Sequence, residues 1–453
     1  MEDLQKRNDG QKQKVDKPAA RTSRFPGFYK LDIWERLDKL GEWFPLTTKE
    51  KWLLKNETLK AEKADLMVEN VIGVFGMPLA VALNFRINDK DWVIPMAVEE
   101  TSIVAACGHI AKLVRENGSL TANASHAIME GQVQLVKVPD IDRAVKDILE
   151  AKDRLLKLAN KQDRTLVSLG GGAKDLTCRR LETASGPMLI IHLAVDVVDA
   201  MGANAVNTMV ETLGPVLGEI AKGEVVLQII SNLCDKAIAR ARFEMDPACL
   251  GSKEMSGARV AERIIQAYHF ADADPYRAAT HNKGIMNGVD AVLLATGNDW
   301  RAVEAGMHAY AARTGRYRSL SSYRLENGKL IGEIEVPVAV GVVGGVTKLH
   351  PGVELILRLM GMPSRRELAE VIASVGLIQN LGALRALVTE GIQEGHMTLH
   401  ARNVAYSAGA FGDAAIKVAD QMIQEGRIRF DRARELVKKL IIQKQPEDGN
   451  GED

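Results

Sequence analysis

The run QVQLVKV at 132–138, followed by IDRAVKDILEAKDRLLKLANK at 141–161, decides the fold of the middle of this chain. The first run alternates as a strand does, and the second gathers its apolar residues on one side of a helix. Four more elements are predicted downstream: strands at RTLVSL (164–169), PMLIIHLAVDVV (187–198) and EVVLQII (224–230), and a helix at 203–222. The order strand-helix-strand-strand-helix-strand is typical of a ferredoxin-like unit, which we place at residues 127–232. GGG at 170–172 lacks the G-x-G-x-x-G spacing, so a Rossmann domain is not predicted.

The sequence on both sides of this unit has a different rhythm. Residues 79–98 indicate a strand hairpin that turns at Asn88-Asp89. Helices are predicted at 61–69, 102–116, 365–374 and 381–389. We therefore predict an α+β protein, in which residues 23–126 and 233–390 form one large mixed helical and sheet domain around the inserted unit.

The two ends of the chain are predicted separately. Residues 391–443 indicate a helical section whose boundary is marked by Gly391 and Gly395, so it could move as a flap. Residues 1–22 and 444–453 are polar, which is typical of a disordered arm and tail. The N-terminus lacks the apolar core of a signal peptide, and the most apolar runs are shorter than the roughly 20 residues of a membrane helix. A soluble protein is expected.

Composition excludes several classes of function. The 453 residues carry 59 Lys and Arg against 59 Asp and Glu, so there is no basic field for nucleic acid or anionic lipid. Aromatic residues make up 5%, which argues against a platform for stacking bases. The four cysteines form no C-x-x-C pair, which argues against a zinc knuckle and favours a reducing cytoplasm.

Four short stretches carry an ionisable side chain beside a glycine, a proline or a small residue. They are PMAVEETS with Glu100, THNKGIMNG with Lys283, ATGNDWRA with Asp299, and EGIQEGHMTLHARN with His396. A carboxylic acid, an ammonium, a carboxylate and an imidazole can together manage protons around a carbonyl whose oxygen gains charge. Their joint presence predicts an enzyme site.

Each of these residues also has an ordinary structural interpretation. Glu100 is either a solvated carboxylate or an acid whose pKa is raised by an apolar wall. Lys283, expected in a loop, is either exposed or held against a developing oxyanion. Asp299 is either a helix N-cap or a partner of Lys283. His396 and His400 have the i, i+4 spacing of metal ligands, but no third ligand is obvious, so no metal site is predicted.

Seven motifs occur here in one order: ENVIG, PMAVEE, DAMGAN, HNKGIMNG, GNDWRA, GVVGGVTK and GHM. This set closely resembles 3-hydroxy-3-methylglutaryl-CoA reductase of the soluble class (class II) found in bacteria and archaea. The resemblance runs from about residue 23 to about 435. It implies an oxidoreductase of the mevalonate pathway of isoprenoid biosynthesis, which interconverts the acyl thioester and mevalonate plus CoA by two hydride transfers.

The resemblance also implies roles for individual residues. Lys283 would stabilise the oxyanion, Glu100 would protonate the aldehyde oxygen, Asp299 would tune both, and His396 would protonate the departing CoA thiolate. Three residues fall where the family contacts the hydroxymethylglutaryl group: Ser102, Arg277 and Asn287. The large domain would then bind substrate and CoA.

The nicotinamide cofactor is implied to bind the small domain. DAMGAN supplies Asp199, Met201, Gly202 and Asn204 near its pyrophosphate and nicotinamide. Asp163 stands where NADH-using relatives place an acid, since a carboxylate accepts from a ribose 2′-OH and repels a 2′-phosphate. NADH is therefore favoured, although the flanking Lys161 and Arg164 leave NADPH open.

The remaining expectations come from the same resemblance. Glu394 departs from the family pattern, and so does the arm at Tyr29 and Lys30, which affects the expected contact with CoA. A cytoplasmic homodimer, or a multiple of dimers, is implied. Two other hypotheses stay open: a CoA-thioester transferase or hydrolase with Cys107 as nucleophile, and a nucleic-acid binder that uses the ferredoxin-like unit.

Overall fold

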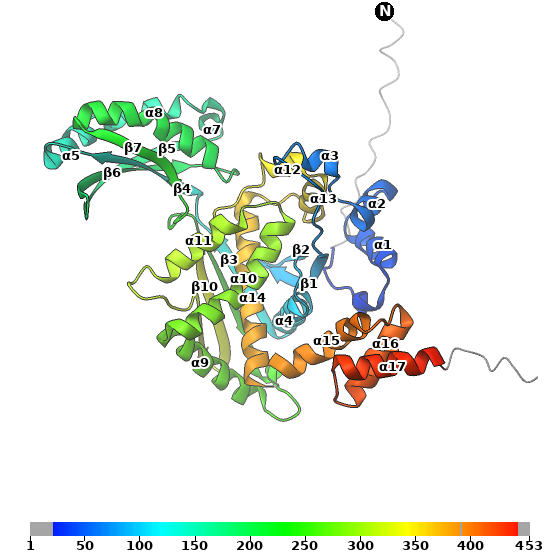
Figure 1. The fold of residues 1–453 in the computed structure, drawn as a ribbon. Helices are drawn as coiled ribbons and strands as arrows, with labels where there is room; N and C mark the ends of the chain where they lie inside the picture. Colours follow the sequence, from blue (N-terminus) through cyan, green and yellow to red (C-terminus); the bar gives the residue numbers. More distant parts are fainter. Residues whose placement is uncertain (1–20, 390–391, 443–453) are drawn as a thin grey trace, which may run out of the picture.

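The computed structural model describes residues 21–389 and 392–442, and their side chains except those at 347–348, 392–399 and 441–442. These residues form three antiparallel sheets, which helices cover (Figure 1). The strands are β1 Leu79–Ile87, β2 Lys90–Ala97, β3 Gly118–Ala124, β4 Ile128–Val136, β5 Gly172–Thr183, β6 Gly186–Asp196, β7 Glu224–Ser231, β8 Ile238–Met245, β9 Ser321–Glu326 and β10 Lys329–Pro337.

Most of the other elements are α-helices. Those before the third sheet are α1 Ile33–Trp43, α2 Thr48–Asn56, α3 Ala61–Ala64 and α4 Ile103–Asn117. Those next to the third sheet are α5 Ile141–Glu150, α6 Lys152–Asn160, α7 Arg164–Ser168 and α8 Ala203–Ala221. The later helices are α9 Gly257–Ala273, α10 Pro275–Ala295, α11 Trp300–Ala311, α12 Val346–Leu349, α13 Pro351–Leu359, α14 Arg365–Val388, α15 Ile392–Ser407, α16 Asp413–Gln424 and α17 Phe430–Ile442. Two short 3₁₀ turns, Phe28–Lys30 and Pro247–Leu250, complete the set.

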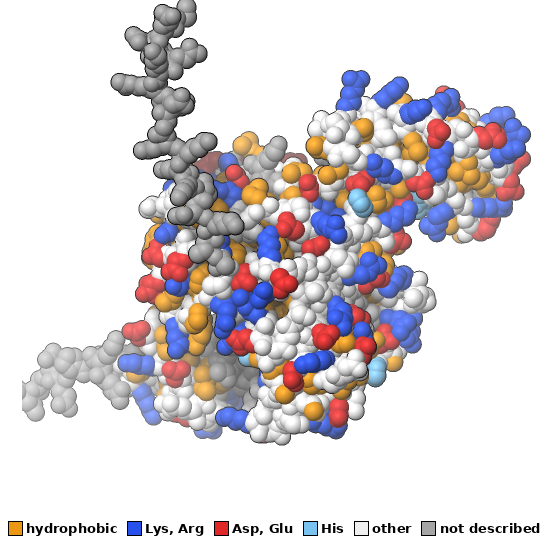
Figure 2. Space-filling model, turned by 180° about the vertical axis from the view of Figure 1, so that it is seen from behind, with side chains coloured by type: hydrophobic (Ala, Val, Ile, Leu, Met, Phe, Trp, Pro, Cys, Tyr) orange, Lys and Arg blue, Asp and Glu red, His pale blue; other side chains and the backbone are white. Residues whose placement is uncertain are grey.

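The third sheet has the strand order β5-β6-β4-β7, which places the first strand between the third and the fourth. This is the ferredoxin-like arrangement, and it confirms the predicted fold class. Helix α8 packs closely on β4. A Cβ at Gly131 of β4 would lie only 2.5 Å from the side chain of Val210 of α8, so the glycine permits this approach. The sheet and its helices have their own apolar core and stand clear of the main body (Figures 1 and 2).

The predicted strand at 164–169 is wrong. Asp163 caps a short helix, α7, and the true partner of β6 is β5, which begins at the last residue of the triple glycine, Gly172. The two strands pair from Gly172↔Asp196 to Thr183↔Gly186, as a hairpin. Because β5 is an edge strand with many exposed polar residues, its sequence carries little of the apolar signal that marks a strand.

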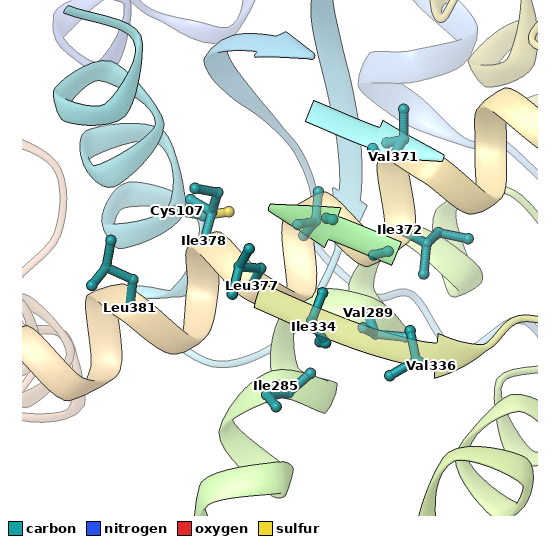
Figure 3. Packing of buried hydrophobic residues seen from close by; sticks show 14 of the residues in the cluster. Cys107, Ile285, Val289, Ile334, Val336, Val371, Ile372, Leu377, Ile378 and Leu381 are labelled. Atoms are coloured by element: carbon teal, nitrogen blue, oxygen red, sulfur yellow. The ribbon is translucent and has the colours of Figure 1, made fainter. Parts of the chain in front are cut away.

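Helix α14 runs through the centre of the main body, beside the sheet ordered β3-β8-β10-β9 (Figure 1). Side chains of α14 pack with Ile334 and Val336 of β10, with Ile285 and Val289 of α10, and with Cys107 of α4 (Figure 3). The helix is long and apolar enough to cross a membrane, but 72% of its apolar window is buried inside the molecule. It is therefore the core helix of this body.

Two helices predicted at 365–374 and 381–389 are in fact this single helix. Gly376 and Gly382 do not end the helix. Their role is in packing, since they let neighbouring elements approach closely. A Cβ at Gly376 would lie 3.0 Å from Val289, and one at Gly382 would lie 3.2 Å from Ile110. The hairpin turn at Asn88-Asp89 is confirmed, with φ values of 50° and 61°, which these two residue types tolerate.

The C-terminal helices α15, α16 and α17 share a small apolar core of their own, which includes Ala401, Val418 and Met422. The helix predicted at 61–69 is only the single turn Ala61–Ala64. The predicted disordered arm and tail, apart from residues 21–22, lie outside the described residues.

Candidate active site

Lys283 and Glu100 are brought together by the fold. Lys283 Nζ lies 3.1 Å from Glu100 Oε2, although 183 positions separate the two residues. Lys283 lies in α10 and not in the predicted loop, because Asp274 caps a helix that begins at Pro275 and continues through both glycines of its motif. Gly288 is needed for packing, since a Cβ there would lie 3.0 Å from Gln379 and Val375 of α14.

Glu100 lies in the turn between β2 and α4, not in an apolar wall. Its side chain is 38% exposed and that of Lys283 is 62% exposed, so the ion pair faces solvent. Two residues later, Ser102 adopts a left-handed φ of 77° at the start of α4. Its buried Oγ has no hydrogen-bond partner among the described residues. An unpartnered hydroxyl two residues from Glu100 could hydrogen-bond a ligand.

One face of α10 continues the site. Asn287 and Asp290 follow Lys283 at i+4 and i+7, so the three side chains share that face. Burial, and then the nearby Glu304 carboxylate of α11, raise the pKa of Asp290. The pair of Asp290 and Glu304 was not predicted from the sequence. The feature that could have indicated it is an acidic residue in an apolar run, two helical turns after Lys283. Asp290 is thus a proton-holding group on the same face of α10 as Lys283, two helical turns further along.

Arg277 lies near the start of α10 and is half-buried. Burial lowers the pKa of its guanidinium. Among the described residues, no carboxylate lies within ion-pair distance of it. A half-buried cation of this kind is suited to an anionic ligand.

Asp299 caps α11, as its structural interpretation predicted. Its Oδ1 accepts from Ala302 N at 3.1 Å and lies 3.6 Å from Arg301 Nε. A contact with Lys283, the other interpretation, is not among the contacts of the described residues. Asp299 and Lys283 are nevertheless on consecutive helices, which the turn at 296–298 joins.

His281 and Asn282, which precede Lys283, anchor the helix. His281 Nε2 lies 2.8 Å from Ser321 Oγ, and Asn282 Oδ1 accepts from Leu320 N at 3.0 Å. Burial lowers the pKa of His281 to about 3, so this imidazole is neutral. These contacts fix the middle of α10 to the start of β9, which holds Lys283 in place.

The DAMGAN loop leads into α8 and has the features of an anion site. Gly202 caps the helix with φ 89°, and no side chain caps the first turn. A Cβ on Gly202 would lie 2.2 Å from Val197, so glycine is required there. The loop also has a half-buried Met201, and Asn204 is exposed in the first turn of α8. The free amides at the start of a 19-residue helix can hold a phosphate.

Comparison with known proteins decides the family. The profile of the hydroxymethylglutaryl-coenzyme A reductase family matches residues 32–401. The chain belongs to this family. It is 49% identical to the 3-hydroxy-3-methylglutaryl-coenzyme A reductase of Archaeoglobus fulgidus, over 93% of this chain and 95% of that one. It is 32% identical to a probable reductase of Borreliella burgdorferi, over 83% and 87% of the two chains.

Solved reductase structures agree. The Streptococcus pneumoniae reductase superposes with a TM-score of 0.79 at 39% identity, covering 92% of this chain and all of that one. A class II reductase structure from the same organism, bound to NADPH in open conformations, gives a TM-score of 0.78 at 41% identity and covers 81% of this chain and all of that one. Membership of the reductase family, which the motifs predicted, is thereby confirmed.

Other predicted residues of the reductase site are placed as follows. Asp163 caps α7, with Oδ1 accepting from Leu166 N at 2.8 Å. His396 and Glu394 belong to α15, but their side chains lie outside the described residues. In the part of the chain with described side chains, no cluster of three or more His, Cys, Asp or Glu could hold a metal ion.

Proposed function

We propose that this chain interconverts 3-hydroxy-3-methylglutaryl-CoA and mevalonate plus CoA. Membership of the reductase family supports the reaction, and the 3.1 Å approach of Lys283 Nζ to Glu100 Oε2 carries the assignment of the site. A cation next to a carboxyl group suits a carbonyl whose oxygen first becomes negative and then takes a proton. Two reduced nicotinamide molecules, bound one after the other, would each supply one hydride.

In this proposal the protein's own residues handle charge and protons. Lys283 donates hydrogen bonds to the oxygen of the thioester carbonyl as it gains charge. Glu100 must take up a proton, losing the charge it has in the ion pair, and it then gives this proton to the aldehyde oxygen in the second reduction. Asp299 tunes both groups through hydrogen bonds. His396 protonates the CoA thiolate, so that a neutral thiol leaves instead of an anion. The role of His396 rests on the family motif alone.

Substrate recognition is proposed for three further residues. Arg277 is a half-buried cation that would pair with the substrate carboxylate. The buried Ser102 Oγ lacks a partner, and Asn287 lies one helical turn beyond Lys283. Tyr29 and Lys30 lie in the N-terminal 3₁₀ turn, and Tyr29 is exposed, so a contact of this arm with CoA is also proposed.

The residues at the start of α8 fit a nicotinamide dinucleotide. Gly202 and the uncapped amides would hold its pyrophosphate, and Asp199, Met201 and Asn204 would lie along it. The NADPH-bound relative supports a cofactor of this type. We propose NADH as the preferred form, since Asp163 keeps Oδ2 free of described partners after Oδ1 caps α7. Exposed Lys161 and Arg164 beside it are the residues that would favour NADPH.

The domain roles follow from the same assignment. Residues 23–126 and 233–390 would bind substrate and CoA, residues 127–232 would bind the cofactor, and residues 391–443 would close over the site as a flap. The segment that includes ENVIG supports a homodimer or a multiple of dimers. It exposes Leu66, Ile72 and Phe75, of which Ile72 and Phe75 are almost fully exposed. Contiguous apolar exposure of this kind is typical of a protein interface.

The likeness to bacterial class II and archaeal enzymes supports a cytoplasmic location. The two alternative functions are disfavoured. Cys107 is completely buried in the main core, and burial raises the pKa of its thiol, the opposite of what a nucleophile needs (Figure 3). Nucleic-acid binding is disfavoured because acidic and basic side chains are interspersed on the visible face of the ferredoxin-like unit (Figure 2).

The direct test is cofactor oxidation with the hydroxymethylglutaryl thioester, run separately with NADH and NADPH. Thioester-dependent oxidation, with mevalonate and CoA as products, is expected. No oxidation of either cofactor would refute the proposed reaction. A lower kcat/KM with NADH than with NADPH would refute only the proposed preference.

A further inference from the structure

The turn between α10 and α11 is held by the side chain of Asn298. Its Nδ2 donates to Thr296 Oγ1 at 3.0 Å, and its Oδ1 accepts from Gly341 N at 2.8 Å. Because both ends of the amide are used, the side chain has one orientation. The next residue is Asp299, so the position of the Asp299 backbone is tied to Gly341.

The segment at Gly341 lies directly against the cofactor loop. A Cβ added to Gly341 would lie 2.5 Å from Met201 N and 2.9 Å from the Ala200 carbonyl carbon. The next residue, Val342, donates its N–H to Asp199 O at 2.9 Å. Asn298 therefore reaches, through a single backbone segment, the loop proposed to hold the cofactor.

A second anchor fixes the same loop from the other side. Asp199 Oδ1 accepts from Arg365 N at 3.0 Å. The Arg365 side chain is buried and donates to Ser125 O at 3.0 Å and to Val338 O at 3.2 Å. Because the loop is held at Asp199, the contact at Gly341 sets the distance between this loop and Asp299.

We propose that Asn298 is a positioning residue, which sets the separation between the Asp299 carboxylate and the cofactor loop at Met201 through the Gly341 N–H. The inference rests on the proposed reductase function. Asparagine suits this position because it both donates and accepts: aspartate could still accept from Gly341 but could not donate to Thr296. Misplacement of reacting groups by about 1 Å can lower a rate by about 100-fold.

The test compares Asn298→Ala, Asn298→Asp and Gly341→Ala with the unsubstituted protein. The measurements are kcat, the dissociation constant of the nicotinamide cofactor, and the deuterium isotope effect on kcat with the cofactor labelled at its hydride position. Asn298→Ala should lower kcat by about 10- to 100-fold and raise the isotope effect, since hydride transfer becomes slower than the other steps. Asn298→Asp should recover part of the rate, and Gly341→Ala should lose rate because its Cβ meets backbone atoms.

Asn88→Ala is the matched control. The Asn88 side chain also donates and accepts, at 2.8 Å and 2.9 Å to the Ala122 backbone, but it lies at the far end of the β1–β2 hairpin. It should lower stability while leaving turnover per folded molecule unchanged.

The outcomes separate the two proposals. Inactivity of the unsubstituted protein would overturn the reductase function and the positioning role together. With an active parent, unchanged kcat or an unchanged isotope effect in Asn298→Ala would overturn the positioning role alone. If Asn298→Ala does not fold, Asn298→Asp and Gly341→Ala decide the question by the same measurements.

Discussion

Lys283 Nζ and Glu100 Oε2 are 3.1 Å apart across a solvent-facing ion pair that joins α10 to the turn before α4. Neither residue is buried, so the pair contributes little to stability. Ser102, two residues after Glu100, has a buried Oγ without a hydrogen-bond partner among the described residues. Together the two features favour a chemical role over a role in folding.

Lys283→Ala should therefore abolish reduction and leave the fold intact. Loss of one oxyanion donor lowers kcat by about 100- to 1,000-fold. The free energy of unfolding should change by less than about 1 kcal/mol. Thioester-dependent cofactor oxidation and urea unfolding check the two parts. Lys39→Ala is the control, because Lys39 also makes an exposed ion pair, 2.8 Å from Glu42, in a helix away from the site. Retention of more than about a tenth of the rate would contradict the role of Lys283.

His396→Gln should impair reduction of the thioester more than reduction of free mevaldehyde. Only reduction of the thioester releases a thiolate, which needs a proton from His396. Reduction of the aldehyde releases no thiolate, and its proton comes from Glu100. The measurement is the ratio of kcat values for the two substrates, with His400→Gln as the matched histidine control. Equal losses on both substrates would show that His396 does not protonate the thiolate.

Asp163→Asn should shift cofactor preference toward NADPH without loss of stability. Asparagine keeps an oxygen that can cap α7 but removes the negative charge that would repel a 2′-phosphate. We expect the ratio of kcat/KM for NADPH to that for NADH to rise about tenfold, equivalent to roughly 1.4 kcal/mol. Asp163→Ala, which also removes the cap, should in addition destabilise the protein by about 1 kcal/mol. An unchanged ratio in both variants would exclude Asp163 from cofactor selection.

Asp290→Asn should make stability less dependent on pH. Burial, and then Glu304, raise the pKa of Asp290 to about 8 in the folded state. Between pH 4 and this value the folded protein holds more protons than the unfolded chain, so its stability falls as pH rises. Asparagine has no proton to lose, so the variant should not lose stability in this way. Relative to the parent, we expect its free energy of unfolding to rise by about 1–2 kcal/mol from pH 5 to pH 8, since Asp290 keeps some contact with solvent.

Urea unfolding of the parent and Asp290→Asn at several pH values measures this difference. Glu304→Gln should flatten the same pH dependence, because it removes the neighbouring carboxylate. Parallel stability curves for the parent and both variants would mean that the pKa of Asp290 is not raised in the folded protein.

Cys107→Ala should keep full turnover per folded molecule. Cys107 is completely buried in the core, so removing its sulfur leaves a small cavity and lowers the free energy of unfolding by about 1 kcal/mol. Activity is measured per molecule of folded protein. Loss of turnover in a fully folded Cys107→Ala variant would revive the nucleophile hypothesis.

Much of the fold could be predicted from periodicity. The hairpin at Asn88-Asp89 and the ferredoxin-like order were both readable, since apolar residues mark buried faces and these two residue types mark turns. The edge strand β5 and the short helix α7 were not, because exposed polar residues carry no burial signal. Likewise, two helices were predicted where α14 is continuous, and its internal Gly376 and Gly382 mark close packing.

The site was predictable as a set of residues but not as an arrangement. The motifs named Glu100, Lys283 and Asp299, yet Lys283 was expected in a loop, and the sequence left open whether Asp299 caps a helix or pairs with Lys283. Asp290 was missed altogether, because its pKa depends on burial and on Glu304, a residue of the next helix.

By itself, the sequence determined which chemical groups the protein carries, the family to which it belongs and which segments bury their faces. These depend on residue identity and local spacing, which are visible along the chain. Only the tertiary structure decided that Lys283 meets Glu100 and that Asn298 joins Gly341, which lies against the loop at residues 199–202. Such contacts link residues far apart in sequence, and they form only when packing of the core brings separate elements to one place.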